Sequence, residues 1–545
     1  AVEQGAALVL ASPHAGKESE IDVLNFQAVQ SFLNGDANNA SLLWQKPTSA
    51  LAHGGGEQIP ESSEAEFALF DFIAMLTDQM DCVPSTEPTL TIDDLVLTDH
   101  HAALRSAALL LSDSLPSADE YNAIDEDINS LDPALDRIMS TPAYAERIAM
   151  IYEDALLTNT YRSKNNSRTL QKAWGQQTDS QGNTRGRYQW FKDYVTHPQE
   201  NERDVYNEMA SHTAYGFSRS AKELVKYVIK EQKEFGEILT ANYTMMNIYS
   251  APIFEREDAF DAGYFDDESY WAQRDAGFPE LDGGTLPSPP SPSANRYQFK
   301  PVVIPAPVPT AGLLSDINFL ATWPTNPVNL NRSRSREVLK TFLNTDILAL
   351  VNRTPESFAG TDTNPTYNDP TCVSCHHIMD PIAGAFQNYP KHQFQALYDP
   401  LHVNAQARWA ETDPATKLLP PGLSKSHLVP SDRMDDSLSW LAEQIVNDPR
   451  FAAATVRVIF QGLSGRAAMT APNIEDDNYL QQQRAYQLQR HYFEGLETVF
   501  VQNDLDLNTM IKAMMKSPLI RVSNFNHPNP YLHKHFGLHR MLTPE

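Results

Sequence analysis

Apolar positions recur every three to four residues along most of the chain, which is the spacing of an amphipathic helix. The stretch 437–446 is the clearest example, because Asp435 and Asp436 can cap its start and Pro449 follows its end. The same spacing predicts further helices at 22–34, 64–77, 101–112, 133–158, 218–239, 335–351, 450–463 and 480–502. Alternating patterns are scarce, and residues 301–304 predict one short strand. The expected fold class is therefore mainly α.

Proline interrupts this helical pattern in the middle of the chain. Residues 279–309 contain nine prolines and few helix formers. Polyproline geometry would hold such a segment extended, so it predicts a stiff linker or strap between two helical halves. A chain of 545 residues is also long enough for several domains.

The charge balance narrows the choice of partners. Lys and Arg number 42 and Asp and Glu number 70, which gives a net charge of -28. Such a surface repels phosphate backbones and anionic lipid, which argues against nucleic acid as a partner. The apolar runs are much shorter than the roughly 20 residues that span a bilayer, so no membrane span is expected. The first ten residues lack the basic and apolar regions of an export signal, so any such signal has been removed or lies upstream.

Two of the three cysteines carry the strongest chemical signal. Cys372, Cys375 and His376 form Cys-x-x-Cys-His, the attachment sequence of a c-type haem. Thiols at this spacing can add to two vinyl groups on one porphyrin edge, and the next residue then directs its imidazole at the iron. A redox dithiol, half of a zinc site and a disulfide are the alternatives, but a dithiol does not need His376 and zinc would need ligands from elsewhere. The third cysteine, Cys82, is predicted to be a small buried apolar residue.

The haem propionates would need cationic partners. Arg332, Arg334 and Arg336 lie just before and within a predicted helix start, and we expect Arg334 and Arg336 to bind the propionates. Arginines at alternate positions cannot all face one direction, so a solvated basic patch is the other interpretation.

The sixth iron ligand separates an electron carrier from an enzyme, because an open iron can bind oxygen or peroxide. His427 and Met434 follow His376 by 51 and 58 residues and are the expected suppliers, in a proline-flanked loop before the helix at 437. Met379 is too close to His376 to reach the opposite face and is predicted to pack. Other candidates are His53, His392 and His402.

Several blocks of sequence have a recognisable order. Residues 42–56, with the helix from Ser63, resemble the back half of a c-type cytochrome domain, and 107–117 with 237–244 resemble a helical module. Residues 311–314 with 372–386 resemble a haem-bearing module, and 448–451 with 465–466 resemble the module that follows it. Together they resemble the planctomycete-type cytochromes, which are large exported bacterial haem proteins with flanking domains of unknown function.

This resemblance implies a multi-domain helical protein. The expected parts are a cytochrome c-like domain at 1–82 without its own attachment motif, a helical domain at 83–278, a Pro-rich linker at 279–309, a haem c-bearing module at 310–436 and a C-terminal helical domain at 437–545. The first part has either lost a haem or follows an attachment segment before residue 1. At the other end, Thr543 and Pro544 read as a helix start, so both termini are expected to be cut.

The implied function is electron transfer by an exported c-type cytochrome with one covalent haem. The implied location is the periplasm or the exterior of a bacterium of Gram-negative type. A basic protein or another cytochrome would be its redox partner. The chain is much longer than one haem requires, which keeps two alternatives open: a haem peroxidase or oxygenase with an open distal site, and a structural subunit of a multi-haem surface assembly.

Overall fold

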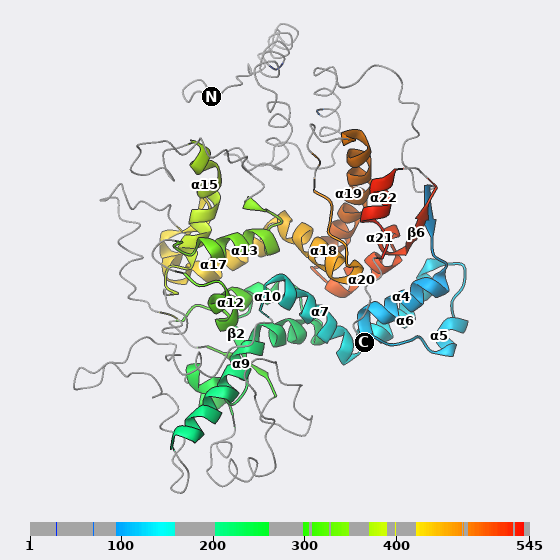
Figure 1. Ribbon diagram of the computed structural model, residues 1–545. Helices are drawn as coiled ribbons and strands as arrows, with labels where there is room; N and C mark the ends of the chain where they lie inside the picture. The colour runs from blue at the N-terminus through cyan, green and yellow to red at the C-terminus, as the bar shows by residue number, and fades with distance from the viewer. Residues whose placement is uncertain are drawn as a thin grey trace, which may run out of the picture. The chain divides into compact units, whose positions relative to one another are not determined.

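The computed structural model describes residues 94–158, 202–254, 256–260, 298–304, 308–325, 329–347, 370–389, 421–470, 478–526 and 529–538, with Val29, Leu69, Tyr398 and Pro472 besides. Helices dominate this part of the chain, at 65% of its residues, which confirms the expected mainly α class (Figure 1). No helix within the described ranges is long and apolar enough to cross a membrane. The helices expected at 22–34 and 64–77 lie outside the described residues, apart from Val29 and Leu69.

The chain forms two compact units. Unit 1 comprises Ala1–Leu97, Arg466–Glu494 and Pro518–His539, and unit 2 comprises Thr98–Gly465, Gly495–Ser517 and Arg540–Glu545. The candidate haem motif belongs to unit 2. The domain boundaries expected from the sequence stay a prediction.

Unit 2 contains most of the described elements. In chain order they are α4 (His100–Ser112), α5 (Ala118–Asn122), η2 (Ile128–Leu131), α6 (Asp132–Met139), α7 (Pro142–Ala155), α9 (Glu202–Lys230), α10 (Glu237–Thr240), β2 (Tyr243–Met246), η3 (Ala251–Phe254), η4 (Glu257–Ala259), β3 (Lys300–Val303), η7 (Gly312–Ser315), α12 (Ile317–Thr322), α13 (Arg332–Phe342), α15 (Pro370–Ala385), β4 (Gly422–Ser424), β5 (His427–Leu428), η10 (Ser431–Asp436), α17 (Ser437–Asn447), α18 (Pro449–Ser464) and α20 (Leu507–Lys516). The long helix α19 (Tyr479–Gln502) runs from unit 1 into unit 2.

Helix boundaries follow local capping chemistry. The prediction of a single helix at 133–158 is wrong. Thr141 caps a new helix by accepting a hydrogen bond from the Tyr144 amide, and Pro142 occupies the first position of that helix. Two helices, α6 and α7, result. The helix expected at 335–351 ends at Phe342, since Asn344 adopts a left-handed backbone with φ of 44°. By contrast, α18 begins after the capping residue Asp448 and stops at Gly465, close to the expected 450–463.

The strand expected at 301–304 is confirmed as β3, which pairs antiparallel with β2 in the register Tyr243↔Val303 to Met246↔Lys300. Pro301 is tolerated because this sheet has two strands and therefore only edges. The described part of the Pro-rich segment thus includes a paired strand.

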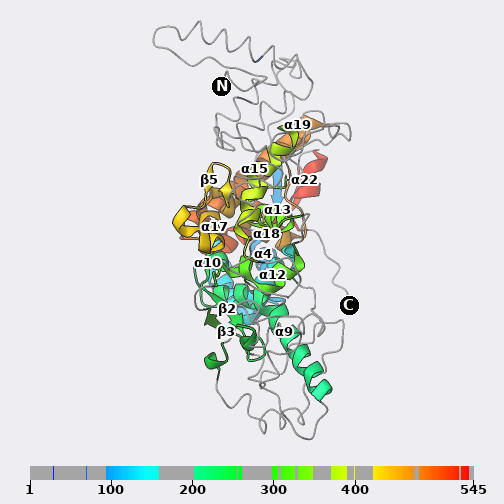
Figure 2. The ribbon, with the colours of Figure 1, turned by 90° about the vertical axis from the view of Figure 1, so that its left-hand side faces the viewer.

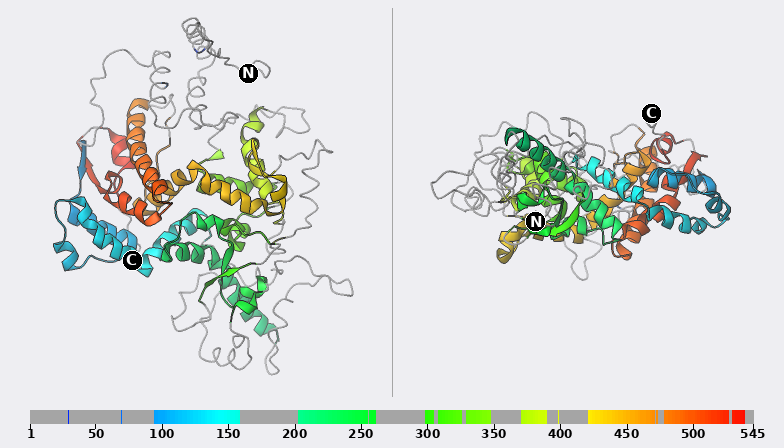
Figure 3. Two further views of the ribbon diagram at one scale, coloured as in Figure 1. Left: turned by 180° about the vertical axis from the view of Figure 1, so that it is seen from behind. Right: turned by 90° about the horizontal axis from the view of Figure 1, so that it is seen from below.

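Unit 1 is built around a second small sheet. Strand β1 (Leu95–Leu97) pairs antiparallel with β6 (Val522–Phe525), and Figure 3 shows them side by side. The helices α21 (Pro518–Arg521) and α22 (Pro530–His535) flank β6 in the sequence. Arg466 donates to the carbonyls of His533, Lys534 and Gly537, and so satisfies the last turn of α22.

Candidate functional site

The Cys-x-x-Cys-His motif lies on α15, which packs against α13, the β4–β5 hairpin and α17 (Figure 1). A helix brings residues three apart to the same side, so the backbone puts Cys372 and Cys375 on one face. Cys375 is 3% exposed, and its Sγ donates to the Ile347 carbonyl at 3.7 Å. The side chain of Cys372 lies outside the described part.

His376 is held by a carboxylate one helical turn further on. Its Nδ1 lies 3.0 Å from Oδ1 of Asp380, and the two side chains are 15% and 4% exposed. Burial raises the pKa of Asp380, but hydrogen bonds from His376 and Arg332 outweigh burial and leave the pKa lowered. The carboxylate is therefore ionised and can only accept, so His376 donates Nδ1–H, and Nε2 is the ring nitrogen whose lone pair a metal would use.

Arg332 completes this arrangement from α13. Its Nε donates to Oδ1 of Asp380 at 2.7 Å and one Nη donates to Oδ2 at 2.9 Å, which is the bidentate geometry of a strong ion pair. Ser335 Oγ of α13 donates to the Met379 carbonyl of α15 at 2.7 Å, and Asn331, just before α13, donates through Nδ2 to the carbonyl of Phe386, just after α15, at 3.3 Å. Helix α13 thus fixes the position of the histidine-bearing turn.

The three arginines point to different partners, as their alternate spacing requires. Arg334 is 3% exposed and donates to the carbonyls of Leu320, Trp323 and Tyr389 and to the Asn331 amide oxygen. These four acceptors are all uncharged. The binding of a propionate by Arg334 stays a prediction. Arg336 is half-buried, and its Nε is buried without a hydrogen-bond partner among the described residues. A buried cationic donor without an acceptor is costly, so Arg336 suits an anionic group.

The expected suppliers of a sixth ligand come from two elements. The loop expected around His427 is instead the β4–β5 hairpin, whose strand β5 is labelled in Figure 2. His427 is exposed, and its ring meets the Trp440 ring edge-on at 5.2 Å. Met434 is half-buried in η10. Both assignments stay predictions. Three further candidates lie outside the described residues: His53, His392 and His402. Cys82, predicted to be a small buried apolar residue, also lies outside them.

The β4–β5 hairpin bonds a carbonyl of α15 that a proline leaves without its helical partner. Pro381 lies inside the helix and lacks the N–H that would bond to the carbonyl of His377, four residues earlier. The Lys425 N–H donates to that carbonyl instead, at 2.9 Å. The hairpin turn at Lys425, two residues before His427, is therefore bonded to His377, the neighbour of His376.

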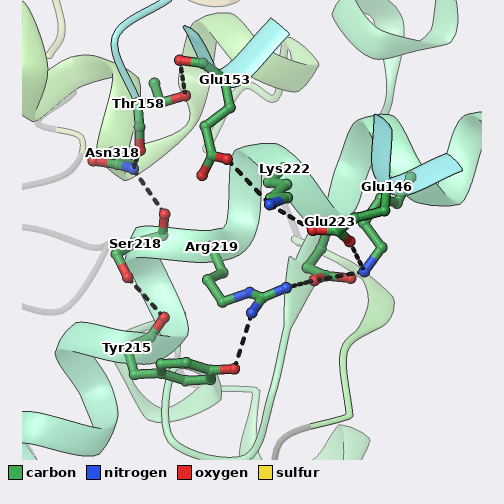
Figure 4. A network of polar contacts seen from close by, with 10 residues as sticks. Glu146, Glu153, Thr158, Tyr215, Ser218, Arg219, Lys222, Glu223 and Asn318 are labelled. Carbon is green, nitrogen blue, oxygen red and sulfur yellow. Dashed lines mark hydrogen bonds and ion pairs between the residues drawn. The ribbon is translucent and has the colours of Figure 1, made fainter. Parts of the chain in front are cut away.

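A second polar cluster, which the sequence reasoning missed, lies between α7 and α9 (Figure 4). Lys222 bonds Glu146 at 2.6 Å and Glu153 at 3.2 Å, and Lys226 bonds Glu146 at 3.0 Å. Arg219 bonds Glu223 at 2.7 Å, one helical turn away. Acids and bases balance in this cluster, which is typical of a network that joins two helices. Only its pairs within α9 were readable from spacing, since Glu146 and Lys222 are far apart in the sequence.

No known family profile matches the chain, and no curated protein and no solved structure matches it significantly.

Proposed function

We propose that this chain is a c-type cytochrome that carries one covalent haem at Cys372, Cys375 and His376 and transfers electrons. The observation that carries the proposal is that the attachment motif lies on a helix whose histidine already donates Nδ1–H to Asp380. The nitrogen that remains, Nε2, is the one that can bind iron.

The donor set fits a haem c. The two thiols would each add across a porphyrin vinyl group, forming one C–S and one C–H bond without an oxidant. Cys375 is buried, and so is Ile382 about two helical turns further along α15, which suits the largely apolar porphyrin. Arg336 has a buried donor for a propionate, and we propose it ahead of Arg334, whose donors already have acceptors. When bound, the haem would supply an iron that accepts and releases one electron.

For the sixth position we place His427 ahead of Met434. The hairpin that carries His427 is fixed to α15, and the imidazole of His427 is exposed, so its ring nitrogens are accessible to an iron. If His427 binds the iron, the spectrum is that of a bis-histidine haem. If Met434 binds, a charge-transfer band at about 695 nm appears. Replacing each by Ala and recording this region decides between them.

The resemblance to the planctomycete-type cytochromes supports export to the periplasm or beyond. The net charge of -28 supports a basic redox partner, such as another cytochrome, rather than nucleic acid. Electron exchange with a basic cytochrome should then slow as salt rises from low to physiological ionic strength. An exchange rate that does not change with salt contradicts this partner.

One observation favours a haem peroxidase or oxygenase as the second candidate. The Asp380 carboxylate makes His376 a stronger electron donor than a neutral acceptor would, which favours the oxidised states used in oxygen chemistry. Carbon monoxide separates the two functions. A reduced spectrum that ignores carbon monoxide supports the carrier, and a ready shift supports an open iron and the enzyme.

The proposal is tested by expressing the full chain, with a secretion signal, in bacteria that have c-type haem maturation. We expect haem-linked peroxidase staining to stay with the denatured wild-type band, and Cys372→Ala with Cys375→Ala to abolish it. Cys82→Ala is the matched control and should keep the stain. Equal staining of the double variant and the wild type would contradict attachment at this motif.

A further inference from the structure

The carboxylate of Asp380 is shared between a histidine and an arginine. His376 Nδ1 and Arg332 Nε both contact Oδ1, at 3.0 and 2.7 Å, while an Arg332 Nη contacts Oδ2 at 2.9 Å. Asp380 is 4% exposed, so water screens these interactions weakly. Arg332, Asp380 and His376 thus form one continuous chain of charge-assisted hydrogen bonds between two helices. The chain ends at Nδ1 of His376, the ring nitrogen that leaves Nε2 available.

We propose that Asp380 and Arg332 are positioning residues that set how strongly His376 donates electrons to the haem iron, an inference that rests on the proposed function. Asp380 fixes the tautomer and the ring orientation, and its negative charge strengthens the imidazole as a ligand. Arg332 withdraws charge from the same carboxylate and so weakens this effect. The reduction potential of the haem then depends on the balance between the effect of Asp380 and the opposing effect of Arg332.

This balance predicts opposite effects from the two partners of one ion pair. Asp380→Asn keeps an acceptor for Nδ1–H but removes the charge, so ferric iron loses stabilisation and the potential rises. Arg332→Gln leaves the charge of Asp380 unneutralised, so His376 donates more strongly and the potential falls. A pair that only holds α13 against α15 would give shifts of the same sign, because either change loosens the same contact.

The test uses the full chain with its covalent haem. Reduction potentials are measured for the wild type, Asp380→Asn, Asp380→Glu and Arg332→Gln, and Asp380→Glu should stay nearest the wild type because it keeps the charge. The matched control is Asp448→Asn, since Asp448 also forms a bidentate pair, with Arg450, but contacts no histidine in the described contacts. The control should leave the potential unchanged.

A second measurement separates ligand strength from a charge acting through space. A background with His427→Ala and Met434→Ala leaves the sixth position open, so resonance Raman of the reduced haem gives the iron–histidine stretching frequency, which should fall in Asp380→Asn and rise in Arg332→Gln. Shifts in potential without these changes, or with the same sign in both variants, overturn the inference while the proposed function stands. If Asp380→Asn does not take up haem, the Arg332→Gln results decide alone. A wild type without covalent haem overturns the proposed function and this inference together.

Discussion

His376 and His377 follow each other on α15, yet their described contacts differ. His376 bonds the buried Asp380 carboxylate through its ring, whereas the contact described for His377 is its backbone carbonyl, which accepts from Lys425. A change of side chain at His377 leaves that carbonyl in place. Successive helix residues also point about 100° apart, so only one of the two rings can face a haem held by Cys372 and Cys375.

We therefore predict different spectra for two alanine variants. His376→Ala should keep the thioethers but lose the wild-type ligand-field spectrum, because the axial ligand is gone. His377→Ala should keep that spectrum. Optical spectra of both purified variants check this, and equal effects would count against His376 as the ligand.

Arg334 and Arg336 should separate stability from haem binding. Arg334→Met leaves three backbone carbonyls without their donor, so we expect a loss of about 3 kcal/mol in the free energy of unfolding. Arg336→Met removes a donor that has no partner in the described chain and should cost less stability, but should change the haem potential by removing a charge near a propionate. Chemical denaturation measures the free energy of unfolding and potentiometry measures the haem potential of both variants. An Arg334→Met variant with unchanged stability and a changed haem potential would reverse the two assignments.

Individual residues also show where sequence reasoning works. The haem motif was readable because its chemistry fixes residue type and spacing. The sequence reasoning missed Asp380, although its position four residues after His376 would have indicated the contact if the motif had been placed inside a longer helix. Arg332 could not be paired with Asp380 from the sequence, because the contact joins two helices that meet only in the folded chain.

Among the elements, α15 shows how tertiary contacts override a local rule. Pro381 usually ends a helix, so the sequence supports no more than a turn around the motif. The helix continues to Ala385 because the Lys425 amide bonds the carbonyl that Pro381 leaves free. The division into α6 and α7 shows the reverse, a local signal that decides the structure. Thr141 and Pro142 form a helix start that can be recognised in the sequence inside a continuous apolar pattern.

The α7–α9 network predicts a pH dependence with two signs. Burial raises the pKa of Glu146, but hydrogen bonds from Lys222 and Lys226 lower it to about 2, below its ordinary 4.5. Its ionised form therefore stabilises the fold above about pH 4.5, and this contribution is lost as pH falls toward 2. Burial raises the pKa of Glu153, so its contribution is present at low pH and is lost as pH rises.

We expect Glu146→Gln to cost about 1 kcal/mol at pH 7, a modest value because this carboxylate is 37% exposed. The cost should shrink as pH falls from 4.5 toward 2. For Glu153→Gln the cost should grow as pH falls, which makes the two variants controls for each other. Denaturation curves across this range check both, and parallel pH profiles would contradict the assigned signs.

At the scale of the whole molecule, helical periodicity was enough to predict a mainly α chain. The grouping of segments was not readable, because unit 1 joins residues near 95, 480 and 525, which are remote in the sequence. The functional account depends on one motif and on the contacts around its histidine.

The most direct test of the central claim is the intact mass of the denatured full chain, after acid–acetone extraction, from bacteria that mature c-type haem. One haem bound through Cys372 and Cys375 predicts a mass higher than that of the polypeptide by about 616 Da. A chain of unmodified polypeptide mass, with its haem recovered in the acetone phase, would contradict it.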